Sequence, residues 1–199
     1  MPTSAGPTVP VRDRILAAAA DLARASGWRQ VRMTAVAARA GVSRQTVYAQ
    51  FETKDGLARG LVTVEVERVV GLAVAAMEGH PVGDPAGAIA AGVRAVLDEG
   101  RRNALLRVVL DRGPGGDPEL IRLLTSDAAP VYVTLWNAVA PWVRRTFPAA
   151  DLPTLAAVID VLGRVTVSHL VQPGAGDLDV ARTVSGMAVG YLRSHSAPA

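Results

Sequence analysis

Cysteine is absent from the chain, and only 4% of its residues are aromatic, although half of them are hydrophobic. The absence of cysteine excludes disulfides and cysteine-ligated metal sites, and it leaves the redox compartment open. A chain of 199 residues nevertheless buries roughly 70% of the surface that it exposes when unfolded. One domain, or two small ones, can therefore fold without covalent cross-links.

Long hydrophobic runs are absent as well. The longest uncharged stretch, residues 128–143, contains Pro130, Asn137 and Pro141, whereas a membrane span needs about 20 apolar residues. The first eleven residues hold three prolines but no charged segment followed by an apolar run, so they do not resemble a secretory signal. We expect no contact with a membrane, and we expect residues 1–11 to form a disordered arm.

Catalytic signatures are missing too, because the sequence contains no HExxH, GxSxG or GxxxxGK[ST] motif and no paired-carboxylate signature. The run GPGG at Gly113–Gly116 lacks the spacing of a phosphate-binding loop, and a plain loop explains it. His80 and His195 are expected in solvent, while His169 lies in an apolar segment, where a core or interface role is commoner than ligation. An enzyme is therefore not expected, and neither is a metal ion or another cofactor.

Positive charge is concentrated at the N-terminal end. Residues 1–60 contain nine basic and four acidic residues, whereas the remaining 139 residues contain 12 basic and 14 acidic ones. A basic segment joined to a mildly acidic remainder suggests that one end of the protein meets a polyanion. Exposed arginines also solvate ordinary surfaces, so charge alone does not decide between these interpretations.

Apolar residues recur at helical spacing through nearly the whole sequence, which predicts an all-α fold. Ile15, Ala19, Leu22 and Ala23 form one stripe of a first helix, which Gly27 ends. Glycine- and proline-rich turns separate the later segments, and the valine-rich stretches among them keep a helical period. The predicted helices span residues 12–26, 34–40, 44–51, 54–77, 86–102, 104–111, 118–127, 128–146, 151–171 and 177–194.

Residues 33–51 carry the spacing of a helix-turn-helix, in which two short helices cross closely around a turn with glycine. Ala37 is small enough for the close crossing, and Gly41 suits a left-handed turn. Val42 and Val47 supply an apolar plug from the two sides of that turn. The second helix of the pair is therefore expected to lie in the major groove of DNA.

This second helix presents side chains that can read DNA. Thr34 is expected to cap the first helix and Ser43 the second, and both caps also suit a phosphate because helix N-termini favour anions. Arginine and glutamine can make bidentate hydrogen bonds to guanine and adenine. The residues that face away from the plug are Arg44, Gln45, Thr46, Tyr48, Ala49 and Gln50.

Beyond the spacing, the segment contains a longer pattern of particular residues: Val36-Ala37, Ala40-Gly41-Val42-Ser43, Tyr48, Phe51, Lys54 and Leu57. With this pattern, residues 12–61 resemble the tetracycline-repressor (TetR) family of bacterial regulators. The resemblance implies a three-helix DNA-binding domain over residues 12–58, followed by a larger helical ligand-binding and dimerisation domain over residues 59–199. Gly56 departs from the family pattern, which favours a charged or bulky helix former there, so we expect it to loosen the start of the fourth helix.

The resemblance also implies roles on DNA. The residues implied to contact phosphates are Thr34, Tyr48 and Lys54, with Ser43 at the helix start. The residues implied to face bases are Arg44, Gln45, Thr46 and Gln50. Two alternatives stay open, since Tyr48 could pack on the helix-turn-helix core and Lys54 could be a solvated charge at a helix start.

A candidate ligand site lies in the segment 128–146. Tyr132 and Trp136 stand one helical turn apart on an apolar stripe, and Pro141 removes the hydrogen bond that the Asn137 carbonyl would accept, which predicts a kink. A bent helix with an amide and two aromatic rings could line a mostly apolar pocket, so Tyr132, Trp136 and Asn137 are the candidate ligand-binding residues. A plain core explains the stripe equally well.

The helices predicted over residues 151–171 and 177–194 are expected to form a four-helix interface with the same helices of a second copy, as in the family. The first of them is apolar around much of its circumference, more than a monomer should expose. The apolar residues on which this expectation depends are Leu155, Val158, Ile159, Leu162, Val165 and Val167.

These features together predict a cytoplasmic, homodimeric transcriptional regulator that acts as a repressor. It would bind a palindromic double-stranded DNA operator and be released by a small, largely apolar effector, neutral or anionic. The effector would favour a dimer whose recognition helices no longer match successive major grooves, through the fourth helix. The alternative is a helical protein-interaction or ligand-storage module that retains the helix-turn-helix.

Overall fold

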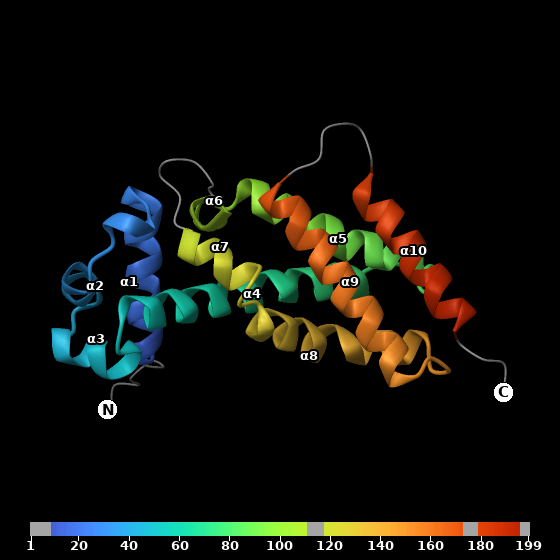
Figure 1. Ribbon diagram of the computed structural model, residues 1–199, viewed down its shortest axis with the longest axis horizontal. Helices are drawn as coiled ribbons and strands as arrows, with labels where there is room; N and C mark the ends of the chain where they lie inside the picture. Colours follow the sequence, from blue (N-terminus) through green and yellow to red (C-terminus); the bar gives the residue numbers. More distant parts are fainter. Residues whose placement is uncertain (1–8, 111–117, 173–178, 196–199) are drawn as a thin grey trace, which may run out of the picture.

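A computed structural model of the chain describes residues 9–110, 118–172 and 179–195. Over these ranges the chain is built from helices and contains no strand, which confirms the predicted all-α fold. Figure 1 shows the N-terminal helices at one end of an elongated molecule and the C-terminal helices at the other. The elements are α1 (Val11–Ser26), the 3-10 helix η1 (Trp28–Gln30), α2 (Met33–Ala40), α3 (Arg44–Phe51), α4 (Lys54–Glu78), α5 (Pro85–Arg102), α6 (Ala104–Leu110), α7 (Pro118–Leu124), α8 (Ala129–Thr146), α9 (Leu152–Val171) and α10 (Val180–Ser194).

Side-chain caps set the starts of α3, α4, α5, α9 and α10. In each case an oxygen of the residue before the helix accepts a hydrogen bond from a backbone N–H three residues further on, which satisfies a donor that the helix leaves unpaired. The capping residues are Ser43, Thr53, Asp84, Asp151 and Asp179. The predicted boundaries at these turns are therefore confirmed to within a few residues.

Two predicted boundaries are wrong. Thr34 does not cap α2, because this helix begins at Met33, and the residue before it, Arg32, makes no capping hydrogen bond through its side chain. The arm predicted over residues 1–11 does not include Val11, because α1 begins at that residue. Residues 1–8 of that arm lie outside the described residues, as does the loop predicted at Gly113–Gly116.

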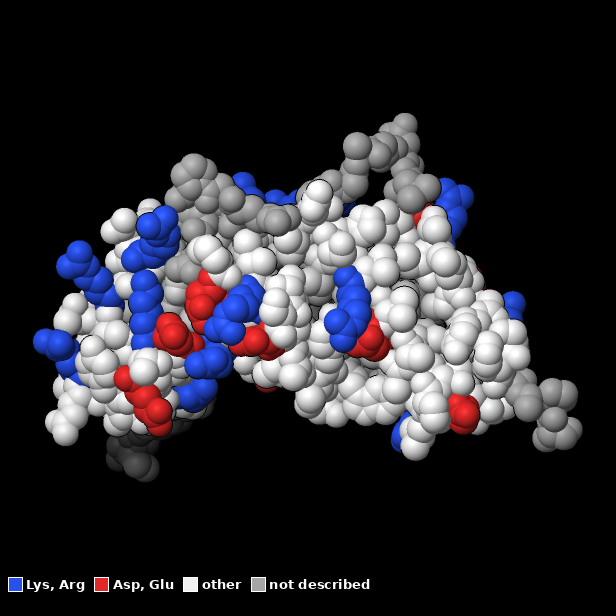
Figure 2. Space-filling model, in the orientation of Figure 1, with Lys and Arg blue, Asp and Glu red and all other residues white. Residues whose placement is uncertain are grey.

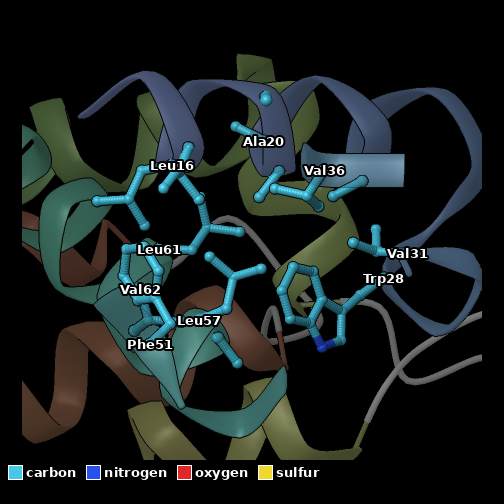
Figure 3. Close-up of a cluster of buried hydrophobic side chains, with 14 of the residues drawn as sticks. Leu16, Ala20, Trp28, Val31, Val36, Phe51, Leu57, Leu61 and Val62 are labelled. Atoms are coloured by element: carbon cyan, nitrogen blue, oxygen red, sulfur yellow. The ribbon is translucent and has the colours of Figure 1, made fainter. Parts of the chain in front are cut away.

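An N-terminal core joins α1, η1, α2, α3 and the start of α4 to α6 and α7. Figure 3 shows Trp28, Val36, Leu57 and Leu61 pointing toward one another from η1, α2 and α4. The Trp28 indole is only 2% exposed. Other buried members of this N-terminal core are Ile15, Ala19, Val47, Phe51, Leu105, Val109, Leu120 and Leu124.

A C-terminal core lies between the far end of α4 and the helices α5, α8, α9 and α10. Since α4 supplies Leu57 and Leu61 to one core and Met77 to the other, this single helix spans both. The long helix crosses the middle of the molecule in Figure 1. Other buried members of this C-terminal core are Ile89, Val93, Val139, Val143, Leu155, Val158, Ile159, Val189 and Leu192.

Most of the apolar residues expected at a dimer interface face inward instead. Leu155, Val158 and Ile159 are buried in the C-terminal core, and Leu162 and Val167 line an internal cavity described below. The reason is that α9 is apolar on nearly all sides, so its sequence does not reveal which side the protomer itself covers. An interface on α9 has to use its other, exposed side.

Helix α9 is the one described helix that is long and apolar enough to span a membrane, with a mean hydropathy of 1.5 and 28% of that window buried. Its apolar run is interrupted by Asp160 and Arg164, so it is not among the long uncharged stretches of the sequence. These two residues form an ion pair at 2.7 Å near the middle of the helix, where charges are costly in a bilayer.

A polar network fastens α4 to the junction of α5 and α6. Asn103 donates from Nδ2 to Glu65 Oε1 at 2.8 Å and to Glu99 Oε1 at 2.9 Å, while its Oδ1 accepts the backbone N–H of Leu105 at 2.8 Å and so caps α6. Arg68 adds ion pairs to both glutamates, at 2.7 and 2.5 Å. Glu65 is therefore buried with its carboxylate satisfied.

Replacing Asn103 by alanine should lower the free energy of unfolding by about 2 kcal/mol, because the change removes a helix cap and leaves the two carboxylates with fewer donors. Asn137→Ala is the matched control, since Asn137 is exposed and makes no hydrogen bond with the described residues. Urea denaturation of both variants gives the comparison. Equal losses for the two variants would contradict the role of the network.

The same network should make stability depend on pH. The hydrogen bond from Asn103, followed by that from Arg68, lowers the pKa of Glu99, so the charged form is favoured in the folded state. This stabilisation is present above the pKa of the unfolded chain and is lost as the pH falls through the lowered pKa. The difference between the wild-type protein and Asn103→Ala should therefore shrink on acidification, and a difference that grows would contradict the assignment.

Candidate nucleic-acid interface and apolar cavity

Helices α2 and α3 form the predicted helix-turn-helix. Ala37 and Val47 are buried between them, and Gly41 ends α2 at a φ of 65°, in the left-handed region that glycine adopts easily. Ser43 then caps α3, because its Oγ accepts a hydrogen bond from the Thr46 backbone N–H at 3.0 Å. Plug, turn and cap together fix the direction in which α3 leaves the core.

The outward face of α3 carries most of the predicted DNA contacts. Tyr48 is 42% exposed, so the alternative in which its ring packs in the core is wrong. Thr46 is half-buried, and its hydroxyl lies 2.8 Å from the hydroxyl of Ser43, so these two oxygens are engaged at the helix start. The predicted contacts that are fully on the surface are Arg44, Gln45, Tyr48 and Gln50.

The start of α2 adds a candidate that the sequence reasoning missed. Arg32 directly precedes α2, is exposed, and makes no hydrogen bond or ion pair with the described residues. Thr34 is exposed in the first turn of the same helix, where backbone N–H groups are unpaired. With a helix start predicted at Thr34, Arg32 does not directly precede a helix. Its observed position immediately before the N-terminus of α2 indicates a phosphate contact.

Lys54 is engaged within the protein. Its Nζ donates to the Arg29 carbonyl at 3.2 Å and lies 5.3 Å from the centre of the Trp28 ring, so it fastens the start of α4 to η1. The side chain is half-buried, and the alternative of a freely solvated charge is wrong. A contact of Lys54 with phosphate stays a prediction. The ammonium would then bind a phosphate while it keeps its hydrogen bond to the Arg29 carbonyl.

Several arginines of the basic segment also hold the fold together. Arg14 donates to the carbonyl of Ala40 at 2.6 Å and thereby ties α1 to the end of α2. Arg39 and Arg24 share Asp21, each at 2.6 Å, and the hydrogen bond from Arg39 is the main cause of the lowered pKa of Asp21. Figure 2 shows the basic side chains gathered over the end that carries α1 to α3, but only part of this charge is free for a polyanion.

Gly56 is required by the turn between α3 and α4. A Cβ at this position would collide with the backbone carbonyl of Phe51, and Glu52 at the turn already has a positive φ of 56°. The Gly56 backbone N–H donates to the Thr53 hydroxyl at 3.0 Å. The expectation that Gly56 loosens the start of α4 is therefore wrong, since the glycine allows a tight and capped start.

An apolar cavity of about 140 Å³ lies among α4, α5, α8 and α9. Its wall includes Val69 and Ala73 of α4, Val93 of α5, Val139 of α8 and Leu162 of α9. An apolar space of this size can accept a small apolar molecule. The space is therefore suited to hydrocarbon and unsuited to a charged group.

Two lining residues carry a hydroxyl, and neither is a strong anchor. Thr166 Oγ1 donates to the Leu162 carbonyl at 2.7 Å, so it is satisfied within α9. Tyr132 is half-buried, and this burial is the main cause of its raised pKa. The Arg164 guanidinium lies 4.6 Å from the centre of the Tyr132 ring, outside the cavity wall.

The candidate ligand residues separate into two groups. Tyr132 lines the cavity, as expected. Trp136 is partly buried against the C-terminal core, and Asn137 is exposed on α8, so neither is part of the cavity wall. Pro141 lies inside α8, which is one helix from Ala129 to Thr146, and Pro141 does not line the cavity either.

The cavity adjoins the N-terminal core directly. Leu124 of α7 belongs to that core and also lines the cavity. Val66 of α4 lines the cavity while packing on the same core. A molecule in the cavity would therefore touch side chains that support the helix-turn-helix.

Two family models match the chain. Residues 15–61 match the model described as bacterial regulatory proteins, tetR family, and residues 84–189 match the model described as bacterial Tetracyclin repressor, C-terminal domain. The first match contains the helix-turn-helix, and the second contains α5 to α9 and most of α10.

Known proteins are similar over nearly the whole chain. The HTH-type transcriptional regulator AlkX of Mycobacterium tuberculosis is 29% identical over 190 residues, which are 93% of this chain and 86% of the relative. A crystal structure of the TetR family repressor AlkX from Dietzia sp., implicated in biodegradation of n-alkanes, superposes with a TM-score of 0.78 at 23% identity, covering 96% of this chain and all of that one. The repressor QsdR of R. erythropolis gives a TM-score of 0.67 at 20% identity, covering 94% and 96% of the two chains.

The two cations beside the helix-turn-helix should differ in their effect on stability. Lys54→Met should lower the free energy of unfolding by about 0.5–1 kcal/mol, because the ammonium leaves the Trp28 ring and the Arg29 carbonyl. Arg32→Met should leave stability unchanged, since Arg32 is exposed and free of such contacts. Urea denaturation without DNA measures both, and a Lys54→Met protein as stable as the wild type would contradict the structural role.

Proposed function

Because the chain belongs to the TetR family of bacterial transcriptional regulators, we propose that it is a homodimeric repressor that binds a palindromic operator and is released by a small, largely apolar effector. The family consists of transcriptional regulators rather than enzymes. The observation that carries the proposal is the exposed, serine-capped helix α3, which shares a core with α4, the helix that reaches the cavity.

On DNA, α3 would lie in the major groove with its first turns facing the bases. Arg44, Gln45 and Gln50 would contact bases, because their side chains are exposed and suited to bidentate hydrogen bonds. Thr46, in the same turn, would contact a base as well. Tyr48 would contact a phosphate beside them. The remaining phosphate contacts are Thr34, Ser43 and Lys54, together with Arg32.

The exposed side of α9 and α10 would form the dimer interface. Val161 of α9 is 57% exposed, and on α10 Met187 is 70% and Tyr191 44% exposed. Gly186 and Gly190 lie on the same side of α10 as Met187, and a Cβ at either position would meet no atom within 4 Å. A face of small residues around one flexible methionine lets a second helix approach closely, which supports a four-helix interface between two copies.

The effector site would be the apolar cavity. Its wall offers hydrocarbon contact and few polar groups, which supports a largely apolar effector. The similar AlkX protein of Dietzia sp. is implicated in biodegradation of n-alkanes, and a hydrocarbon-like effector suits the same surroundings.

Release would follow from a population shift. An occupied cavity displaces Val66 and Leu124, which also support the N-terminal core, and favours a dimer whose recognition helices are wrongly spaced for successive major grooves. We place the DNA-binding domain at residues 12–58 and the ligand-binding and dimerisation domain at residues 59–199, so α4 crosses the boundary and carries the shift. Because its target is genomic DNA, the protein would act in the cytoplasm.

Arg44→Ala should weaken binding to the preferred operator by roughly 1–3 kcal/mol per half-site, because a bidentate contact to a base is lost, and should relax base preference at one symmetric pair of positions. The operator is first selected from random DNA, and fluorescence anisotropy across a salt series then compares it with a scrambled sequence. If the protein enriches no sequence from random DNA, this result would favour the alternative of a protein-interaction or ligand-storage module over a regulator.

Arg32→Ala is the counterpart of that variant. Its loss should weaken binding to operator and scrambled DNA alike and lower the salt dependence by about one unit per half-site, as expected for one phosphate contact. If Arg44→Ala also weakens both DNAs equally, then Arg44 only holds a phosphate and base reading falls to Gln45, Thr46 or Gln50.

Met187→Glu should convert the dimer into a monomer, because two carboxylates would be buried near the two-fold axis. Val82→Glu is the control, since Val82 is fully exposed in the turn between α4 and α5 and is not part of α9 or α10. Sedimentation velocity at micromolar concentration should show a dimer for the wild type and for Val82→Glu. A monomeric wild type, or a dimeric Met187→Glu, would place the interface elsewhere.

A further inference from the structure

A surface groove of about 750 Å³ opens beside the apolar cavity, between α1, the junction of α5 and α6, and the C-terminal end of α9. Figure 1 shows that end of α9 next to the junction. The apolar part of the groove includes Leu97, Ala104 and Val108. A chain of methylene groups could therefore lie along it at little cost.

The groove and the cavity have two lining residues in common. Leu110 of α6 and Leu170 of α9 line both spaces, and both side chains are half-buried. Gly100 of α5 lies against Leu170 so closely that a Cβ there would collide with the leucine side chain. The partition between groove and cavity therefore consists of leucine side chains, which move by changes of rotamer without any change in the backbone.

The charge at the groove is positive and only partly neutralised. Arg24 and Arg101 line the groove, but each pairs with an aspartate on its own helix, Asp21 at 2.6 Å and Asp98 at 2.5 Å. Arg107 of α6 is exposed on the groove and makes no ion pair with the described residues. No carboxylate is found among the described residues that line the groove, so none of these residues would compete with an anion for Arg107.

His169 completes the polar rim. The hydrogen bond between its Nδ1 and the Val165 carbonyl, at 2.9 Å, requires Nδ1 to be the donor. Its Nε2 is then the ring atom left for a ligand or water at the groove. This side chain accounts for the one histidine that the sequence placed in an apolar segment.

We propose that the effector is a single-chain anionic amphiphile, whose hydrocarbon tail passes Leu110 and Leu170 into the cavity while its anionic head lies in the groove at Arg107. The inference rests on the proposed function, in which the cavity is the effector site. It adds the chemical class of the effector, the position of its head and the route by which it enters.

The size and polarity of the two spaces support this division. The cavity, of about 140 Å³, is close to the volume that holds benzene, or about six carbons, so a longer tail must extend into the groove. An ionised head inside the cavity would be buried among apolar side chains without a cation, which is too costly. At the groove the same head stays hydrated and gains an arginine.

Isothermal titration of the full-length protein with decanoate and with decanol tests the position of the head. The wild type should bind decanoate more tightly than decanol. Arg107→Gln should weaken decanoate binding about fivefold, the effect of one exposed ion pair, and leave decanol binding unchanged. Arg144→Gln should alter neither, since Arg144 is exposed on α8 and does not line the groove.

Equal binding of decanoate to the wild type and to Arg107→Gln, or tighter binding of decanol by the wild type, would overturn the assignment of the head while the cavity remains the effector site. Binding of neither probe would overturn the effector site as well.

Decanoyl-coenzyme A, titrated in parallel, distinguishes the source of the anion. Tighter binding of the thioester identifies an acyl-coenzyme A, tighter binding of decanoate identifies a free acid, and both outcomes support the anionic amphiphile.

The entry route has a separate test. Leu170→Ala removes part of the partition, so stopped-flow fluorescence should show faster association of both decanoate and decanol than with the wild type. Leu152→Ala, at the exposed opposite end of α9, is the control and should leave the rate unchanged. An association rate that Leu170→Ala does not alter would overturn entry through the groove.

Discussion

One helix has to satisfy two hydrophobic cores at once. Helix α4 buries Leu57 and Leu61 with the helix-turn-helix and Met77 with the C-terminal helices, and the residues between them line the cavity. Close-packed cores resist gradual deformation and move between discrete arrangements. A change in packing at the cavity would therefore reach the turn from which α3 projects, because α4 contributes to both.

The polar network around Asn103 limits how α4 can move. Glu65 is buried in the middle of α4, and its carboxylate is satisfied by Arg68 of the same helix and by Asn103 at the start of α6. A half-broken network of this kind is costly, so α4 and the start of α6 should shift together. The cavity and the groove both border Leu110 in α6, so a ligand bound as proposed would lie at the element that this network ties to α4.

The basic N-terminal segment serves two purposes that composition cannot separate. Arg14, Arg24 and Arg39 hold α1 to α2 or pair with Asp21, and Lys54 fastens α4 to η1. These contacts hold the recognition helix in place before any DNA arrives, which limits the entropy lost on binding. Arg32 and Arg44, which make no hydrogen bond or ion pair with the described residues, lie at the starts of α2 and α3, where phosphates and base edges would meet them.

Local patterns in the sequence determined the helices, the helix-turn-helix and its exposed face, because the residues that specify them lie within a few positions of each other. Ser43, Gly41 and Val47 act through their own turn. Only the tertiary structure decided which side of α9 faces inward, that Gly56 avoids the Phe51 carbonyl, and that Trp136 packs in a core beside the cavity instead of lining it. These outcomes depend on how distant or tightly turned segments pack, and hydrophobic period carries no information on which of several apolar faces meets which neighbour.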